Sequence, residues 1–558
     1  MSDPERNSVA NPAKRLPEAL SQAVNRCLVV GFDGTAPTDE LKRLIDEGLG
    51  GVILHTRNVA SSDQLRILTG QLRSLREDLL ISIDQEGGGI GHLVLAGGAE
   101  TPGNWALGVV DDPALTADVA GVLAGNLADH GITVGYGPVA DVHRESANPI
   151  VRTRAFGADP EHVSRHVTAW VEAWLARGVA PCAKHFPGHG STTVDSHHAA
   201  AVDPRGLEEL RAIDLVPFRA AIDAGVPLVM TSHVTYPKLD PLPATVSRRI
   251  LTGLLREELG YQGVVVTDAL EMKAIADEFG EEAGAHLALA AGADQLCIVL
   301  PEPELWFGCA AAVRTAIADG SLDEARVGEA AERVRKLAAR FAKPAVSRAS
   351  GASEASRVPG MSGMPGGSYD IGLRAARRAL GAAPSAAALA LGTSVPASVA
   401  SVPASGASVP APGGAVQAPG AAEPVASASA PASTPYIVDL FRAPHPALEW
   451  DRFDLVNLVR SVLPAAEGVS VTDEAVDCAE ILRRAAGRPL VIATEDAELH
   501  PWQHSVRAAL LAARPDALLI ATGMPDAETA AASGFCTYGR GRANLRAAAE
   551  ALAGGPET

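Results

Sequence analysis

The sequence changes character in the middle of one stretch, Val179-Ala180-Pro181-Cys182-Ala183-Lys184-His185-Phe186-Pro187-Gly188-His189-Gly190. Its first part is an apolar run, which predicts a buried strand. Ionisable side chains begin abruptly at Lys184 and His185, and the proline and glycines after them indicate a loop. The pattern therefore predicts a strand whose end delivers proton-binding groups to a loop. We interpret the rest of the chain as the scaffold for this loop.

Similar apolar runs recur along the first part of the chain. The eight runs are Cys27–Phe32, Gly51–His55, Leu79–Asp84, Ile132–Val142, Val179–His185, Val226–His233, Gly263–Asp268 and Gln295–Leu300. Helical patterns lie between them, at Thr38–Glu47, Ser62–Arg76, Ala114–His130, Pro160–Arg177, Leu207–Ala224, Arg248–Leu259 and Glu281–Ala291. Strands that alternate with helices indicate parallel βαβ units, and eight units predict an α/β fold, a (β/α)8 barrel of the TIM type. The alternative is an open doubly wound sheet, which needs fewer strands and for which the sequence offers no glycine-rich dinucleotide turn.

Polar residues fall where the predicted strands end. Asp84 ends the third run, Asp141 lies at the fourth, Lys184 and His185 end the fifth, and Asp268 ends the seventh. In a barrel these ends share the C-terminal face, where barrel enzymes place their chemistry. A purely structural barrel would have no reason to load that face with ionisable groups.

The composition changes after the eighth unit. A helix from Ser321 to about Ala342, with Ser321 and Glu324 as a capping-box pair, is expected to close the barrel. From Ala383 to Ala422 there is no charge and prolines recur, which predicts a disordered linker. One island within the linker, Ser368–Leu380, resembles a short basic helix that could dock onto the barrel. The predicted domains are a disordered N-terminus (1–15), the catalytic barrel (16–345), an Ala/Pro/Ser/Gly-rich linker (346–435) and a small α/β C-terminal domain (436–558).

Composition excludes several classes of protein. The chain has 558 residues and a net charge of −19 without a Lys/Arg cluster, which argues against a nucleic-acid partner. The N-terminus is polar with no signal-like apolar region, and no apolar stretch is long enough to span a bilayer. A cytoplasmic protein with no membrane partner is expected. The six scattered cysteines predict buried reduced thiols. Nothing in these residues assigns an oligomeric state.

Two carboxylates stand out as candidate catalytic groups. Asp268 lies at the mouth of an apolar strand, where a carboxylate is costly unless it is used or paired. It suits a nucleophile or an electrostatic stabiliser, and the alternative is a cap for a following helix over Ala269–Ile275. Asp195 precedes His197 by two positions, so it can orient the imidazole and raise its basicity for proton transfer. The alternative for that pair is a solvated polar loop.

A metal site is a further alternative for the histidine-rich loop. His185, His189, His197 and Asp195 would be its ligands, but their spacing matches no metal motif, so no metal and no cofactor are expected. Lys184, His185, Arg154 and Asp84 could instead hold sugar hydroxyls, a phosphate or a carboxylate. A simple ion pair between Asp84 and Arg154 is the alternative without a ligand. Neither a serine nucleophile elbow nor a phosphate-loop motif is found in the sequence.

These motifs resemble glycoside hydrolase family 3, in particular its bacterial β-N-acetylglucosaminidases. The likeness runs from about Leu16 to Ala342, and the C-terminal domain resembles, more weakly, the second domain that some members carry. The motifs that carry it, in order, are Gly50-Gly51-Val52-Ile53, Arg57-Asn58, Asp84-Gln85-Glu86-Gly87-Gly88, Gly137-Pro138-Val139-Ala140-Asp141-Val142, Asn148-Pro149, Arg154-Ala155-Phe156-Gly157, Lys184 to His197, Met230-Thr231-Ser232-His233 and Thr267-Asp268-Ala269-Leu270-Glu271-Met272.

The resemblance implies an exo-acting retaining β-N-acetylhexosaminidase. Asp268 matches the family's nucleophile, and His197 matches the acid/base of this subgroup with Asp195 as its partner. The sugar-holding positions are matched by Asp84, Arg154, Lys184 and His185, and His92 stands at a further one. The implied substrate is a glycan or muropeptide with terminal N-acetylglucosamine, which suits peptidoglycan recycling.

Two departures from the family pattern keep alternatives open. Gly89 and His92 stand where relatives typically carry arginines, so the grip on the sugar is expected to be altered unless Arg152 replaces the second one. A histidine acid/base is neutral after it has given up its proton, so phosphate could compete with water, and phosphorolysis is an alternative to hydrolysis. Two further alternative functions are a β-glucosidase and a weakly active sugar-binding protein.

Overall fold

The computed structural model describes residues 17–93, 100–196, 199–342, 367–381, 434–442, 453–532 and 534–554. The predicted disordered N-terminus and most of the predicted linker lie outside them. Within these ranges, eight parallel strands form the predicted barrel. They are β1 (Leu28–Val30), β2 (Gly51–Leu54), β3 (Leu80–Gly87), β5 (Val134–Tyr136), β6 (Ala180–Phe186), β8 (Leu228–Thr231), β11 (Val264–Val266) and β12 (Leu296–Ile298).

The sheet closes on itself. Its strand order is β11-β8-β6-β5-β3-β2-β1-β12, so every strand lies beside its neighbours in the chain, and β12 returns to pair with β1. The remaining gap, between β11 and β12, is bridged by Val266 and Gln295. There the Thr267 N–H donates to the Gln295 carbonyl at 2.9 Å. The prediction of a barrel is confirmed, and the open doubly wound alternative was wrong.

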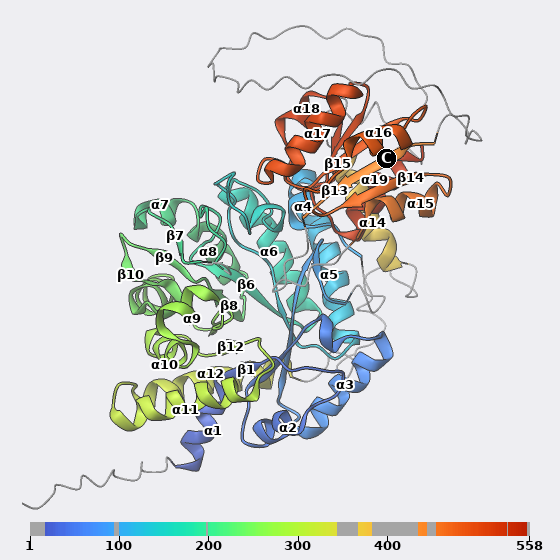
Figure 1. Ribbon diagram of the computed structural model, residues 1–558. Coiled ribbons are helices and arrows are strands. Elements are labelled where there is room, and N and C mark those ends of the chain that lie inside the picture. The colour runs from blue at the N-terminus through green and yellow to red at the C-terminus, as the bar shows by residue number, and fades with distance from the viewer. Residues whose placement is uncertain are drawn as a thin grey trace, which may run out of the picture.

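Helices surround the strands, as Figure 1 shows. Polar N-cap residues precede several helices: Thr38 caps α2, Ser61 caps α3, Asp112 caps α5 and Asp159 caps α6. The two aspartates are each followed by a proline, which suits the first helical turn. The helices of this part are α1 (Glu18–Arg26), α2 (Asp39–Asp46), α3 (Ser62–Leu75), α4 (Asn104–Val110), α5 (Pro113–Asp129), α6 (Pro160–Ala176), α7 (Leu207–Ala212), α8 (Leu215–Asp223), the π-helix η5 (Arg249–Glu258), α9 (Lys273–Phe279), α10 (Glu281–Ala291), α11 (Pro303–Asp319) and α12 (Glu324–Phe341). The single helix expected over Leu207–Ala224 is divided into α7 and α8.

Shorter elements decorate the barrel. The bounds of the strands and 3-10 turns are β4 (Ile90–Gly91), β7 (Ala201–Val202), β9 (Val234–Tyr236), β10 (Asp240–Pro243), η1 (Thr56–Asn58), η3 (Arg152–Arg154) and η4 (Ala244–Val246). Among the described residues, β10, β9 and β7 make a small separate sheet, and β4 pairs with the end of β3.

Helix α12 seals one end of the barrel. Its Val334, Leu337 and Phe341 pack into one apolar cluster with barrel side chains such as Val29 of β1 and Leu80 at the beginning of β3. The opposite, C-terminal end therefore stays available for a site. The expected helix is confirmed, but its predicted capping box was wrong. Asp323 is the N-cap and accepts from the Ala325 N–H at 2.9 Å.

The C-terminal residues form a second α/β unit, the orange and red part of Figure 1. Its parallel sheet has the order β14-β13-β15-β16-β17 among the described residues. The elements are β13 (Tyr436–Leu440), α15 (Leu455–Val462), β14 (Glu467–Val471), α16 (Cys478–Arg484), β15 (Leu490–Thr494), α17 (Pro501–Ala513), β16 (Leu518–Ala521), α18 (Ala527–Ala531), β17 (Phe535–Cys536) and α19 (Arg542–Leu552).

The helix expected over Ser368–Leu380 is α14 (Gly367–Gly381), and it joins the two units. Leu373 and Leu380 belong to the apolar core of the C-terminal unit, whereas Ala375 belongs to that of the barrel. Arg377 pairs with Glu550 of α19 at 2.7 Å, and Arg378 pairs with Asp112 of the barrel at 2.8 Å. The predicted docking onto the barrel is confirmed.

Candidate active site

The C-terminal ends of the barrel strands surround a cavity of about 430 Å³. Six residues singled out from the sequence line it together, namely Asp84, His92, Arg154, Lys184, His185 and Asp268. They come from five different strands or the loops that follow them, and the barrel alone brings them into one place. The predicted loading of this face with ionisable groups is therefore a property of the fold.

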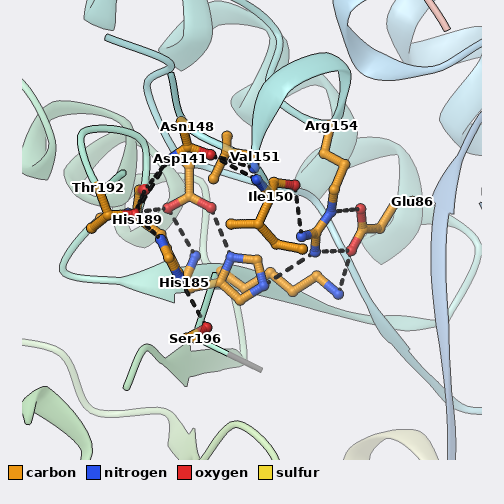
Figure 2. A network of polar contacts seen from close by, with 12 residues as sticks. Glu86, Asp141, Asn148, Ile150, Val151, Arg154, His185, His189, Thr192 and Ser196 are labelled. Atoms are coloured by element: carbon orange, nitrogen blue, oxygen red, sulfur yellow. Dashed lines mark hydrogen bonds and ion pairs between the residues drawn. The ribbon is translucent and has the colours of Figure 1, made fainter. Parts of the chain in front are cut away.

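Lys184 and Arg154 are held by a shared carboxylate, Glu86. The Lys184 Nζ lies 2.6 Å from Glu86 Oε1 and 2.6 Å from Asp84 Oδ1. The Arg154 guanidinium binds Glu86 with both arms, with its Nε 2.9 Å from Oε2 and its Nη2 2.8 Å from Oε1 (Figure 2). The simple Asp84–Arg154 ion pair was therefore wrong: Asp84 pairs with Lys184, and Glu86 pairs with both cations.

This cluster is fixed in its charged form. Burial alone would raise the pKa of the Glu86 carboxyl, but Arg154 and Lys184 outweigh burial and hold it far below its usual range. Burial would likewise lower the pKa values of Lys184 and Arg154, and the neighbouring carboxylates raise both instead. Glu86, Lys184 and Arg154 are therefore expected to be ionised at neutral pH. Asp84 has 24% of its side chain exposed and keeps acceptor capacity toward the cavity.

Asp141 organises the histidines on the other side of Arg154 (Figure 2). It is fully buried, and its Oδ2 lies 2.7 Å from His185 Nδ1 while its Oδ1 accepts from the His189 N–H at 2.8 Å. The second nitrogen of His185, Nε2, lies 3.3 Å from Arg154 Nη2. Burial would raise the pKa of Asp141, but the histidines beside it lower it. A carboxylate on Nδ1 fixes the ring and leaves Nε2 directed at the cavity.

The histidine-rich loop is anchored at its base. His189 Nδ1 lies 2.8 Å from Thr192 Oγ1, and its Nε2 lies 3.0 Å from Ser196 Oγ, which lines the cavity. Burial lowers the pKa of His189 to about 4. The backbone carbonyl of the half-buried Asp195 accepts from the Ala199 N–H at 3.1 Å. The predicted acid/base, His197, lies outside the described residues.

Asp268 stands across the cavity, directly after β11. Its Oδ1 accepts from the Ala269 N–H at 2.8 Å. The alternative role as a cap for a helix over Ala269–Ile275 was wrong, because α9 begins at Lys273 with Met272 as its N-cap residue. A carboxylate at the end of a barrel strand, not committed to a helix, is well placed to meet a ligand.

Glu271 was quoted from the sequence as a motif member, and no role was assigned to it. Its Oε1 accepts from the N–H groups of Val299 and Leu300 at 2.7 and 2.8 Å, while its buried Oε2 has no hydrogen-bond partner among the described residues. Burial raises its pKa to about 7, and the nearby Asp268 charge acts in the same direction. Its spacing of three residues after Asp268 is a signal that could have been used.

Gly89 and His92, which stand where relatives typically carry arginines, have different surroundings. His92 is buried in the cavity wall, with its Nδ1 2.8 Å from Thr56 Oγ1. A Cβ added at Gly89 would meet no atom within 4 Å, so that position has room for a side chain. Arg152 does not replace the missing arginine, because its Nη2 and Nε lie 2.9 Å from the two oxygens of Asp496 in the C-terminal unit.

Glu86 and Asp141 were quoted as motif members without a role, and they prove to be the residues that hold the others. Arg57 also lines the cavity and was given no role. Taken together, the cavity offers a carboxylate on one wall, and fixed donors and acceptors on the other. Such an arrangement can grip hydroxyl groups at several points while presenting one carboxylate to a carbon centre. His185 and His189 were two of the ligands in the alternative metal site of the loop. Their Nδ1 atoms are already in hydrogen bonds, with Asp141 and Thr192 respectively.

Comparisons with known proteins agree with this geometry. A family model, the Glycosyl hydrolase family 3 N-terminal domain, matches residues 20–337. A β-hexosaminidase of Stenotrophomonas maltophilia (strain R551-3) is 38% identical over 283 residues, which are 49% of this chain and 84% of that protein. The structure of a family 3 β-N-acetylglucosaminidase from Paenibacillus sp. str. FPU-7 superposes with a TM-score of 0.77 at 28% identity, covering 96% of each chain. A β-N-acetylhexosaminidase from Beutenbergia cavernae DSM 12333 is 34% identical, covers 57% of this chain and 98% of its own, and has a TM-score of 0.53.

Proposed function

This chain belongs to glycoside hydrolase family 3 and is a glycosidase, and from that premise we propose that it is an exo-acting retaining β-N-acetylhexosaminidase. It releases terminal N-acetylglucosamine from glycans or muropeptides. The observation that carries the proposal is that Asp268 lines the same cavity as the ion-pair cluster of Asp84, Glu86, Arg154 and Lys184. The names of its relatives support the choice of sugar.

The shape of the barrel supports an exo mode of action. The end opposite the cavity is filled by Val334, Leu337 and Phe341 of α12, so a glycan enters from the C-terminal face and cannot pass through. We infer that the terminal sugar enters this cavity and that the aglycone stays on its outer side. Lys184 and Asp84 offer a donor and an acceptor side by side, which is what adjacent sugar hydroxyls require. Arg154, His185 and His92 complete the proposed sugar-binding set.

We infer a double-displacement mechanism. In the first step the Asp268 carboxylate attacks the anomeric carbon, the bond to the aglycone oxygen breaks, and protonated His197 gives its proton to that oxygen. In the second step neutral His197 takes a proton from water, whose oxygen attacks the anomeric carbon and frees Asp268. Asp195 orients His197. Ser196, the last described residue before His197, lines the cavity, and its Oγ lies 3.0 Å from His189 Nε2.

The test is turnover of an aryl N-acetyl-β-glucosaminide. Asp268→Ala should lower kcat by on the order of 10⁴-fold or more, because the covalent step is lost. Asp277→Asn is a matched control, since Asp277 is an exposed carboxylate on the adjacent helix α9. Activity near wild type in Asp268→Ala would contradict the assignment. Comparing aryl glycosides with and without the acetamido group separates this proposal from a β-glucosidase.

Peptidoglycan recycling in the cytoplasm would be the setting of a muropeptide substrate. Among the described residues, no helix combines the length and apolar composition needed to cross a membrane.

A further inference from the structure

Three potential metal-ligating side chains converge where α4 meets α5 and α6. Asp111 is the residue that ends α4, and His162 and His166 lie four residues apart on α6. Side chains at that helical spacing share one face. One ligand atom from each lies within 4.8 Å of the other two. None of the three is among the residues that line the active-site cavity.

The separations suit a tetrahedral ion. Asp111 Oδ1 lies 3.3 Å from His162 Nδ1 and 3.6 Å from His166 Nε2. Ligands at about 2.0–2.1 Å from a tetrahedral zinc ion are about 3.3–3.4 Å apart. Two of the three edges thus already have nearly the required length. Asp111 has a φ of 49°, a left-handed conformation that few residues other than glycine adopt, and two backbone hydrogen bonds hold its N–H there.

His166 is the most constrained of the three. It is fully buried, its ring stacks on Phe156 with centroids 5.2 Å apart, and its Nδ1 lies 2.8 Å from Thr116 Oγ1. Its Nε2 is buried and has no hydrogen-bond partner among the described residues, although it faces Asp111. A buried polar atom without a partner is costly. A second partner on the far ring nitrogen is the usual arrangement of a metal-binding histidine.

A cation already approaches this point. Arg165 Nη2 lies 2.8 Å from Asp111 Oδ1 and 3.2 Å from His162 Nδ1. Half of the Arg165 side chain is exposed, so it can swing into solvent. Among the described residues, the hydrogen bonds of this guanidinium go to Asp111 and His162, and none goes to His166.

We propose that Asp111, His162 and His166 form a site for a divalent transition metal ion of the zinc type, with water as the fourth ligand. Arg165 occupies part of the site when the ion is absent and is displaced when the ion binds. The ion would fasten the end of α4 to α6. The first residue of α4, Asn104, donates from its Nδ2 to the Arg154 carbonyl at 2.7 Å, so the same short helix supports a cavity residue. The proposal does not depend on the proposed function.

The experiment is a titration of the metal-free full-length protein with Co²⁺, followed by its visible absorption, and then with Zn²⁺ as competitor. We expect one equivalent of Co²⁺ with the intense bands of a tetrahedral site, their loss when Zn²⁺ is added, and a Tm raised by Zn²⁺. His162→Ala and Asp111→Asn should each weaken binding by about 100-fold or more. Arg165→Gln should strengthen it by about 2- to 5-fold, because a competing surface ion pair is removed.

His504→Ala is the matched control, since His504 is an exposed histidine 3.9 Å from the Glu528 carboxylate, and it should leave the titration unchanged. The His162→Ala variant removes a partly exposed side chain, and Asp111→Asn keeps the shape of the residue, so loss of binding in both folded variants supports the site. Three results would overturn it: no stoichiometric Co²⁺, binding that survives His162→Ala and Asp111→Asn, or binding abolished by His189→Ala of the cavity instead.

Discussion

An ion pair between Arg152 and Asp496 links the C-terminal unit to a loop of the active site, and Asp496→Asn tests its importance. Arg152 begins the turn η3, which ends at the cavity residue Arg154. Arg152 has a φ of 38°, an unfavourable conformation for a side chain other than glycine, and the contacts around it must hold it there. Asp496 supplies two of these contacts at 2.9 Å. The substitution keeps the size of the side chain and removes its charge.

The magnitude follows from burial. Arg152 and Asp496 have 10% and 12% of their side chains exposed, and breaking such a buried pair from one side costs about 3–5 kcal/mol. The remaining oxygen of asparagine, and the carbonyls of Ser146 and Asn148 at 2.9 and 3.4 Å, retain part of the bonding. We expect about 2 kcal/mol of destabilisation. If about 1 kcal/mol of it appears as misplacement of Arg154, kcat/KM falls about fivefold.

The assay is steady-state kinetics on an aryl N-acetyl-β-glucosaminide together with thermal unfolding. Because Arg154 is proposed to bind the sugar before and during reaction, the loss should appear mainly in KM. Glu550→Gln is the control, since it removes an ion pair of 2.7 Å between α19 and Arg377 of α14 and leaves the contacts of η3 in place. Wild-type kinetics in a destabilised Asp496→Asn protein would refute the reasoning, as would an equal kinetic loss in Glu550→Gln.

Three further predictions concern the chemistry itself. His197→Ala should slow substrates with poor leaving groups by 10²- to 10⁴-fold and activated aryl glycosides far less, because only the former need the proton; equal losses on both would argue against an acid role. Free N-acetylglucosamine should be the main product with or without phosphate, and sugar 1-phosphate as the main product would reassign the enzyme as a phosphorylase. The raised pKa of Glu271, about 7 in the folded state, means that the folded protein binds more protons than the unfolded chain between about pH 4.5 and 7. Its contribution to stability therefore falls as the pH rises through that window, by up to ~3 kcal/mol. Denaturant unfolding across pH should show that slope in the wild type and not in Glu271→Gln, and parallel curves would contradict it.

The barrel could be predicted because its strands are locally encoded. Runs such as Gly263–Asp268 are apolar on both faces and end at polar residues, as buried parallel strands do, and the helices between them carry their own caps. Two predictions of helix bounds were wrong because a nearby residue forms a different local contact. Asp323 competes with Ser321 for the cap of α12, and the single pattern over Leu207–Ala224 is interrupted at Ile213–Asp214, where Asp214 is fully buried and pairs with Arg205.

The site was predictable only in part. A short motif shows which polar residues lie at a strand end, but it does not show which distant residues they contact. An ion pair between Asp84 and Arg154 was the alternative to sugar binding, yet Glu86 binds Arg154, because β3 continues to Gly87 and carries this second carboxylate to it. The pairing of Arg152 with Asp496 joins residues 344 positions apart, for which the sequence offers no signal. Glu271 was quoted as a motif member without a role, because its unusual property arises from the loop after β12: one oxygen accepts from that loop, and the other is buried without a hydrogen-bond partner among the described residues.

Helix α14 bears on how the protein can be divided. Its side chains are shared between two cores, with Leu373 and Leu380 in one and Ala375 in the other, and its arginines pair in both directions. A truncated gene that stops after α12 would strip a wall from α4 and α5, while a fragment starting at β13 would leave its own core uncovered. The solubility and stability of separately expressed halves should therefore depend on which half carries residues 367–381. A split-protein design has to treat this helix as part of both cores.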